Sequence, residues 1–148
     1  MQTSPALAAE LAEWNDGRGI SPLDWIAHTG SFKHFTAYAR LIFPELVEVH
    51  GRLYLLDLFS PERLAELRKQ CNAHRAQAFM NTIDLAALFV DANEQSDEDI
   101  RQFGSFLKDT WTVRVAASFP GRPVHIVLDD RLDEEGVGEL LISLVDEA

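Results

Sequence analysis

The sequence predicts a single α+β domain over residues 1–148, with an antiparallel sheet of about four strands and helices packed on one face. Three observations support this fold class. Several segments carry apolar residues at helical spacing and begin with capping signals. Other short runs are rich in β-branched residues and are bounded by turn signals. A chain of 148 residues that is 47% hydrophobic has enough apolar side chains for one ordinary core.

Three short helices are predicted at the N-terminal end. The first covers residues 5–14, and the glycine-containing stretch 16–19 ends it. The second begins with a serine cap followed by proline, and the third covers residues 32–42. The side chains that indicate these helices are, in order, Leu7, Leu11 and Trp14; Ser21, Pro22 and Asp24; and Phe35, Tyr38 and Ile42.

The middle of the chain predicts a β-hairpin followed by helices. Runs 46–49 and 52–56 flank His50-Gly51, which suits a two-residue turn. A serine-proline pair at 60–61 then opens a helix. One face of that helix carries Leu64, Leu67 and Cys71. The segment 80–90 predicts another short helix.

The last third predicts a helix and two strands. A loop at 91–95 leads to a capping signal at 96–99. The stretch 110–117 alternates like a strand, yet apolar residues also recur every four positions there, so both interpretations stay open. The residues with the helical spacing are Leu107, Trp111, Val115 and Phe119. Runs 124–128 and 140–145 predict antiparallel strands.

Several short motifs are distributed along the chain: Trp14-Asn15-Asp16-Gly17-Arg18-Gly19-Ile20-Ser21, Asp24-Trp25-Ile26, Phe43-Pro44, Met80-Asn81 and Phe119-Pro120. Together they resemble the landmarks of a family of small bacterial proteins that has no established activity. The resemblance covers nearly the whole chain. It implies a continuous helix up to Phe119, which favours the helical interpretation of 110–117, and it implies no functional residue.

The negative charge is concentrated in the second half of the chain. Residues 1–83 carry 9 acidic and 8 basic side chains, whereas residues 84–148 carry 15 acidic and 5 basic ones. Such a surface repels nucleic acid and anionic lipid and attracts basic surfaces. We therefore expect a basic protein surface as partner, and neither nucleic acid nor a membrane. Short apolar runs, a start without a signal-peptide pattern and the single Cys71 predict a cytoplasmic protein.

Two acidic clusters are the candidate partner-binding residues. The first lies at a predicted helix start and consists of Asp97, Glu98 and Asp99. The second lies in a predicted loop and consists of Asp129, Asp130, Asp133, Glu134 and Glu135. Acting together, they would form a docking surface for a basic partner. The alternative is a solvated surface that only promotes solubility.

A second candidate site lies near the N-terminal end. His28 and His34 flank Gly30 and could converge with Asp24 and Trp25 on the wall of a pocket. Proton transfer needs one positioned base, which a histidine would supply. Helix capping and packing explain the same residues without any chemistry.

The metal and cofactor patterns are incomplete. Segment 91–102 resembles a calcium loop, but Ser96 stands where the turn needs glycine and Gln102 replaces the bidentate glutamate. Cys71 and His74 lie three residues apart without a second ligand pair, which favours a buried cysteine. Nucleophile-elbow, Walker and dinucleotide motifs are missing from the sequence. We expect neither a metal nor a cofactor.

These observations favour a non-catalytic, acidic protein-binding module, such as an immunity-type or regulatory protein that covers a basic site on its partner. The alternative is a small enzyme or ligand-binding protein with a pocket near Trp25, His28 and His34. A third interpretation is a subunit of a homo-oligomer with an aromatic interface.

Overall fold

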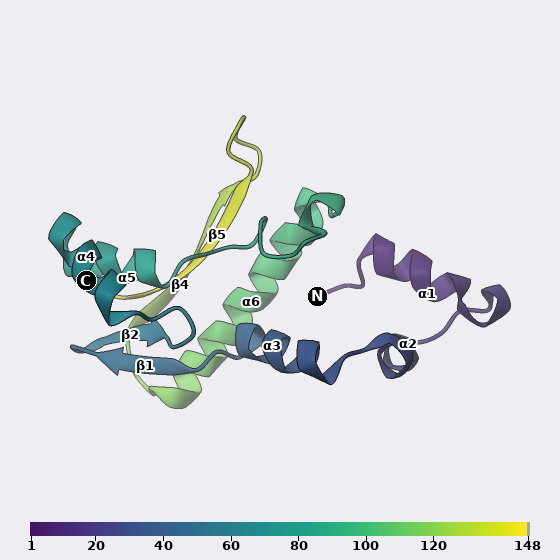
Figure 1. Cartoon of the computed structure of the whole chain (residues 1–148), viewed down its shortest axis with the longest axis horizontal. Coiled ribbons are helices and arrows are strands. Elements are labelled where there is room, and N and C mark those ends of the chain that lie inside the picture. Colours follow the sequence, from purple (N-terminus) through teal and green to yellow (C-terminus); the bar gives the residue numbers. More distant parts are fainter. Residues whose placement is uncertain (148) are drawn as a thin grey trace. The chain divides into compact units, whose positions relative to one another are not determined.

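The computed structural model describes residues 1–147 and divides the chain into two compact units, residues 1–41 and residues 42 onward. The described residues form six α-helices, one 3-10 helix (η1, Ala92–Glu94) and five strands (Figure 1). The α+β class is confirmed. The expected single sheet of about four strands is replaced by two antiparallel sheets, one with two strands and one with three.

The first unit holds three helices, α1 (Pro5–Gly17), α2 (Pro22–Thr29) and α3 (Phe32–Ile42) without its last residue. Regular helical geometry in α1 stops at Trp14, and Asn15 and Asp16 have left-handed φ angles of 57° and 56°. The chain then turns back, so that Ile20 N donates to Leu11 O at 3.1 Å. The predicted helix end is therefore correct.

Helices α2 and α3 present apolar side chains on their surface. The predicted cap of α2 is present, since Ser21 Oγ accepts a hydrogen bond from Asp24 N at 3.1 Å. Neither helix contains a buried residue. In the stripe predicted for α3, Phe35 is 63% exposed and Tyr38 is 48% exposed. Leu11 is the one buried residue among those described in this unit.

The second unit begins with the predicted hairpin, formed by β1 (Leu46–Val49) and β2 (Arg52–Leu55). His50 and Gly51 both have positive φ, 51° and 75°, as a tight two-residue hairpin turn requires. Helix α4 (Pro61–Gln70) lies near this hairpin (Figure 1). The buried side chains between these elements and the next helix are Tyr54, Leu64, Ala76 and Met80. The half-buried Cys71 packs against them.

The helix predicted at 80–90 is wrong. Helix α5 (Ala73–Met80) ends where that helix was expected to begin, and it starts at an Asn72 cap. The residues that follow form β3 (Ile83–Asp84), which pairs antiparallel with β5 (Glu139–Asp146). Pairing with a distant strand therefore overrides the local apolar pattern.

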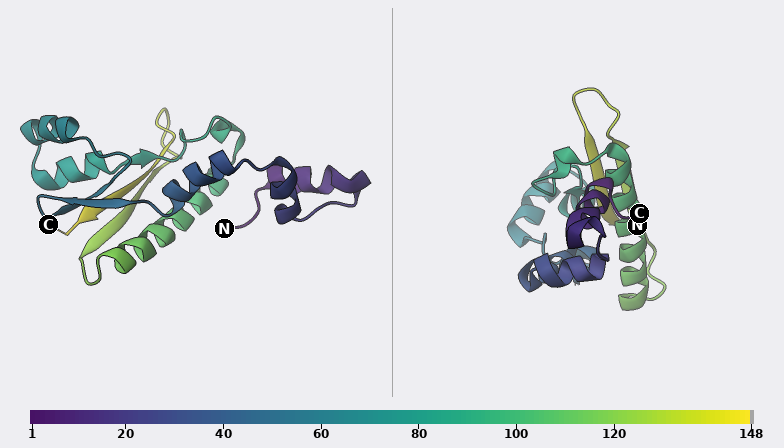
Figure 2. Two further views of the ribbon diagram at one scale, coloured as in Figure 1. Left: turned by 60° about the horizontal axis from the view of Figure 1, so that its bottom comes forward. Right: turned by 90° about the vertical axis from the view of Figure 1, so that its right-hand side faces the viewer.

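The three-stranded sheet has the order β3-β5-β4, with β4 (Val124–Arg131) at one edge. Helix α6 (Asp97–Ser118) runs beside β4 and packs on the sheet (Figure 2). Residues 110–117 belong to this helix, which confirms the helical interpretation. The acidic segment expected to be a loop begins inside β4, because residues 129–131 pair with β5.

Gly104 lets α6 approach the sheet closely. A Cβ atom at this position would lie 2.9 Å from Leu140 Cδ2 and 3.3 Å from Leu128 Cδ2. Contacts this short are closer than carbon atoms normally pack. The absence of a side chain at Gly104 therefore sets the spacing between helix and sheet.

Two side-chain amides, one on α5 and one at its C-cap, connect the two sheets. Asn81 Nδ2 donates to Leu53 O in β2 at 3.0 Å and to Leu144 O in β5 at 2.8 Å. Gln77 Nε2 donates to Leu53 O at 2.9 Å, and Gln77 Oε1 accepts from Asp146 N at 3.1 Å. Both amides are fully buried. They satisfy backbone groups of two strands that belong to different sheets.

Candidate functional site

The first acidic cluster lies in the first turn of α6. Ser96 caps the helix, since its Oγ accepts a hydrogen bond from Asp99 N at 3.1 Å. The same hydroxyl donates to Asp99 Oδ2 at 2.6 Å, so this carboxylate is part of the cap. Asp97 and Glu98 are exposed beside it. Carboxylates are favoured at this position because the helix N-terminus carries partial positive charge.

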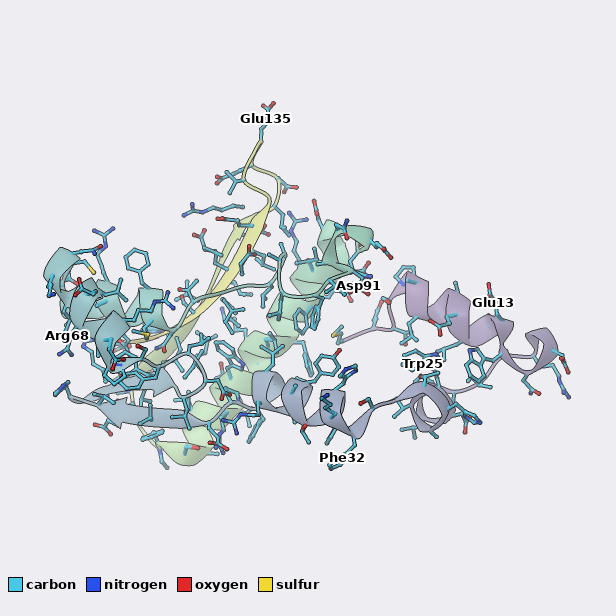
Figure 3. The ribbon with its side chains drawn as sticks, in the orientation of Figure 1. Glu13, Trp25, Phe32, Arg68, Asp91 and Glu135 are labelled. Carbon is cyan, nitrogen blue, oxygen red and sulfur yellow. The ribbon has the colours of Figure 1, made fainter. Side chains whose placement is uncertain are left out.

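The second acidic cluster lies where β4 passes into the turn before β5. Asp129 accepts hydrogen bonds from the Arg131 guanidinium, whose Nη2 lies 2.8 Å from Asp129 Oδ2. Asp130 Oδ1 accepts from Leu132 N at 3.1 Å, which shapes the start of the turn. Figure 3 shows Glu135 at the tip of this hairpin, where it projects away from the sheet.

Arg101 brings the two clusters together. It lies on α6 one turn after Asp97, and its Nε donates to Asp130 Oδ2 at 2.7 Å. Its Nη2 donates to Asp133 Oδ2 at 2.8 Å. The hydrogen bond from Arg101 holds the pKa of Asp130 below its usual value, and the same bond raises the pKa of Arg101. The hairpin is thus attached to the start of the helix.

Half of the eight predicted acidic residues have side chains without a direct hydrogen bond or close ion pair in the described part of the chain, although Glu134 is near enough to Arg131 to act on its charge. These four side chains make neither a hydrogen bond nor an ion pair there: Asp97, Glu98, Glu134 and Glu135. Eight carboxylates opposed by Arg101 and Arg131 leave this surface with a formal charge of −6. We call these ten residues the acidic surface. It consists of carboxylates on the first turns of α6 and on the hairpin between β4 and β5.

The residues of the alternative pocket lie in the first unit and are engaged in local contacts. Trp25 Nε1 donates to Glu10 Oε1 at 2.8 Å. His28 Nδ1 lies 2.7 Å from the carbonyl oxygen of Asp24, one turn earlier on α2. The ring of His34 instead contacts Tyr38 on α3, with ring centroids 6.3 Å apart.

These contacts are those of capping and helix-surface packing. Asp24 accepts hydrogen bonds from Ser21, which lower the pKa of its carboxyl group. His28 also stacks at an angle on Trp14, with ring centroids 5.6 Å apart. All of the predicted pocket residues except Trp25 are exposed. The described geometry favours the packing explanation over a proton-transfer site.

A buried ionic network is the feature that the sequence pattern did not reveal. Asp146, at the end of β5, is 7% exposed. Its carboxylate accepts hydrogen bonds from Arg122 Nε at 2.7 Å, Leu53 N at 3.0 Å and Gln77 Nε2 at 2.6 Å. Burial raises the pKa of Asp146, but these three donors outweigh burial and leave the pKa below its usual value. An acidic residue directly after an apolar strand was the available signal.

This network lies beside a hollow of about 350 Å³ lined by His50, Gly51, Arg52, Arg122, Pro123, Asp146 and Glu147. Arg122 also donates to the carbonyl oxygen of Gly51, and its Nη1 lies 3.2 Å from Glu48 Oε1. The guanidinium is therefore surrounded by its own acceptors. Arg52 donates to Gln77 Oε1 at 3.0 Å. The arrangement neutralises charge within the protein and indicates a structural role.

Within residues 1–147, no group of three or more histidine, cysteine, aspartate or glutamate side chains is arranged to hold a metal ion. No helix in this part of the chain is long and apolar enough to cross a membrane. Comparisons with models of protein families, with curated proteins and with solved structures found no match. The resemblance of the motif at 14–21 to a bacterial family stays a prediction.

Proposed function

We propose that the protein is a non-catalytic binding module whose acidic surface docks on a basic site of another protein, in the manner of an immunity-type or regulatory protein. The observation that carries the proposal is the pair of hydrogen bonds that Arg101 donates to Asp130 and Asp133. It fixes the acidic hairpin beside the acidic start of α6. Charges held in a fixed arrangement favour one complementary partner over others.

The four carboxylates without a hydrogen bond or close ion pair would determine the rate of association with the partner. Exposed charges steer the encounter of two proteins over roughly 8 Å at physiological ionic strength. They contribute little to the free energy of the complex once it has formed. Val137, which is 40% exposed, lies in the same turn as Glu134, whose carbonyl oxygen accepts from Val137 N at 3.1 Å. We assign Val137 as an apolar anchor, because apolar contacts at the centre of an interface mainly slow dissociation.

The test begins with proteins that bind the full chain from a lysate of the producing organism, identified by mass spectrometry. Association kinetics of the recovered partner are then measured with the double variant Glu134→Lys and Glu135→Lys. We expect the association rate to fall by about tenfold or more at low salt and to approach the wild-type rate at high salt. The matched control is Glu13→Lys with Asp109→Lys, two exposed acids outside the acidic surface.

Two further variants separate the roles of the side chains. Arg101→Gln keeps every carboxylate but releases the hairpin, so we expect weaker binding despite a more negative protein. Val137→Ser should raise the dissociation rate and leave the association rate nearly unchanged. Equal association rates for the surface variant, the control variant and the wild type would contradict the proposal.

A further inference from the structure

Strand β4 forms an open edge of the three-stranded sheet. It spans Val124–Arg131, and in the described part of the chain its one neighbouring strand is β5. Natural proteins block such edges with proline, with charged side chains, above all lysine, or with a bulge. Strand β4 contains neither proline nor lysine, and its charged residues Asp129, Asp130 and Arg131 lie at its C-terminal end. Its register with β5 runs without interruption over its whole length. An open edge of this kind presents unpaired backbone groups to another strand.

The ladder determines which backbone groups face outward. Glu147 N donates to Pro123 O at 3.0 Å, so the pair 123–147 is a hydrogen-bonded pair of the antiparallel ladder. Hydrogen-bonded and non-bonded pairs alternate along such a ladder. Odd-numbered residues of β4 therefore bond to β5. The N–H and C=O groups that point to the open edge belong to Val124, Ile126, Leu128 and Asp130.

We propose that this edge pairs antiparallel with β4 of a second copy of the same chain, with Val127 of both copies on the two-fold axis. Only residues with outward-facing groups can form hydrogen-bonded pairs, so opposite residues must have matching parity. One register pairs all four residues with outward-facing groups, 124 with 130 and 126 with 128. In this register His125 lies opposite Asp129 of the other copy.

The side chains on the outer face of β4 are complementary in this register. His125, Val127 and Asp129 point to one face, opposite to Ile126, which is buried. The side chains of His125 and Asp129 are 60% and 46% exposed, and Val127 as a whole residue is 42% exposed. They would form the non-hydrogen-bonded pairs, in which side chains approach most closely. An imidazole would meet a carboxylate on each side of a central valine-valine contact.

The antiparallel direction also fits the charge of the protein. A two-fold axis through Val127 places the acidic hairpin ends of the two copies at opposite ends of the paired strands. A parallel arrangement would bring the two hairpins together and oppose like charges. The two-fold arrangement is closed, because the β4 edge of each copy covers the β4 edge of the other. It takes Asp129 and Asp130 of the acidic surface into the paired strands and leaves Asp97, Glu98, Glu134 and Glu135 outside them. The proposal rests on the open edge of β4 and not on the proposed function.

The oligomeric state of the full chain tests the proposal directly. We expect sedimentation velocity over a concentration series to show a monomer–dimer equilibrium. Val127→Lys should shift it to monomer, because two ammonium groups would meet on the two-fold axis. The matched control is Val113→Lys on α6, where the native valine is 60% exposed. Circular dichroism confirms that both variants fold.

A charge exchange identifies the register. His125→Glu and Asp129→Lys should each weaken the dimer at least tenfold. His125→Glu places two carboxylates opposite one another, and Asp129→Lys replaces the carboxylate that faces the imidazole with an ammonium group. The double variant should regain most of the wild-type affinity, although each substitution also removes a contact within the monomer, to Glu147 and Arg131 respectively. A purely structural effect of these residues would instead accumulate in the double variant.

Three results would overturn the inference. One is a wild-type protein that remains monomeric at every concentration. This result would count against the inference even if the monomer bound an extended peptide along the edge of β4. Another is a dimer that is insensitive to Val127→Lys. The third is a double exchange variant that associates no better than the single variants.

Discussion

Gln77 on α5 and Asn81, the residue that follows α5, donate to the same acceptor, the carbonyl oxygen of Leu53, at 2.9 and 3.0 Å. Both amides also reach β5: Asn81 Nδ2 donates to Leu144 O as well, and Gln77 Oε1 accepts from Asp146 N. Side-chain amides carry both a donor and an acceptor, as a peptide group does. The two side chains therefore bridge β2 and β5 by hydrogen bonds, although these strands belong to separate sheets and do not pair directly.

Replacing Asn81 with leucine should destabilise the protein by about 3 kcal/mol or more, because buried backbone groups lose their partners. These groups include Leu55 N, which donates to Asn81 Oδ1 at 3.0 Å. Urea unfolding measures the change in the free energy of unfolding. The control is Asn93→Leu at an exposed position, where we expect a change of less than about 0.5 kcal/mol. Equal effects of the two substitutions would contradict the connecting role of Asn81.

Replacing Tyr54 with phenylalanine should stabilise the protein by about 1 kcal/mol. The Tyr54 hydroxyl is buried and has no hydrogen-bond partner among the described residues. A phenyl ring keeps the packing against Phe59, whose ring centroid lies 5.1 Å away. Tyr54→Ala, by contrast, should cost about 3–5 kcal/mol through cavity formation. A loss of stability in Tyr54→Phe would show that the hydroxyl is satisfied.

The free energy of unfolding should decrease when the pH is lowered far enough to protonate Asp146. Its pKa is lowered in the folded state, so the carboxylate contributes stability above the unfolded pKa of about 3.9 and loses it as pH falls through the lower folded value. Asp146→Asn should lose about 3 kcal/mol at neutral pH, because Arg122 loses the more buried of its two carboxylate partners and keeps only Glu48. Its stability should then depend less on pH below about 4 than that of the wild type.

Unfolding curves between neutral pH and strong acid measure both effects. Asp109→Asn, at an exposed position on α6, serves as the control and should keep the wild-type pH profile. An unchanged acid profile in Asp146→Asn would assign the acid sensitivity to other carboxylates.

Gly104→Val should destabilise the protein by about 2–3 kcal/mol, because the added atoms overfill the contact between α6 and the sheet. Leu85 Cδ1 also lies only 3.4 Å from the position of the added Cβ. Ser105→Val places the same side chain at the next, exposed position and should cost only the small loss of helix propensity. Similar melting temperatures of the two variants would mean that the interface can relax at little cost.

Local signals predicted the elements of this fold well. Serine caps followed by proline located the starts of α2 and α4, and His50-Gly51 located the tight hairpin turn. In each case the residues that determine the geometry are neighbours in sequence. The overlooked α5 had such a signal too, because Asn72 Oδ1 accepts from Arg75 N at 2.9 Å as an N-cap.

The features that sequence did not reveal depend on distant partners. Strand β3 exists because it pairs with β5, which lies far along the chain. The connection between the two sheets is made by the amides of Gln77 and Asn81, whose spacing alone does not identify their acceptors. The acidic residues were identified from charge alone. Their attachment by Arg101 required the position of the hairpin relative to α6.

The position of β5 at residues 139–146 has a consequence for synthesis on the ribosome. This strand lies between β3 and β4 and also contacts α5, α6 and β2. A growing chain delivers all of these elements before it delivers β5, at roughly 5–20 residues per second. Until then α6 lacks the central strand of the sheet on which it packs, and the amides of Gln77 and Asn81 can bind only β2. A nascent chain that stalls before residue 139 would thus be a substrate for chaperones and proteases, and folding of this unit would follow its translation.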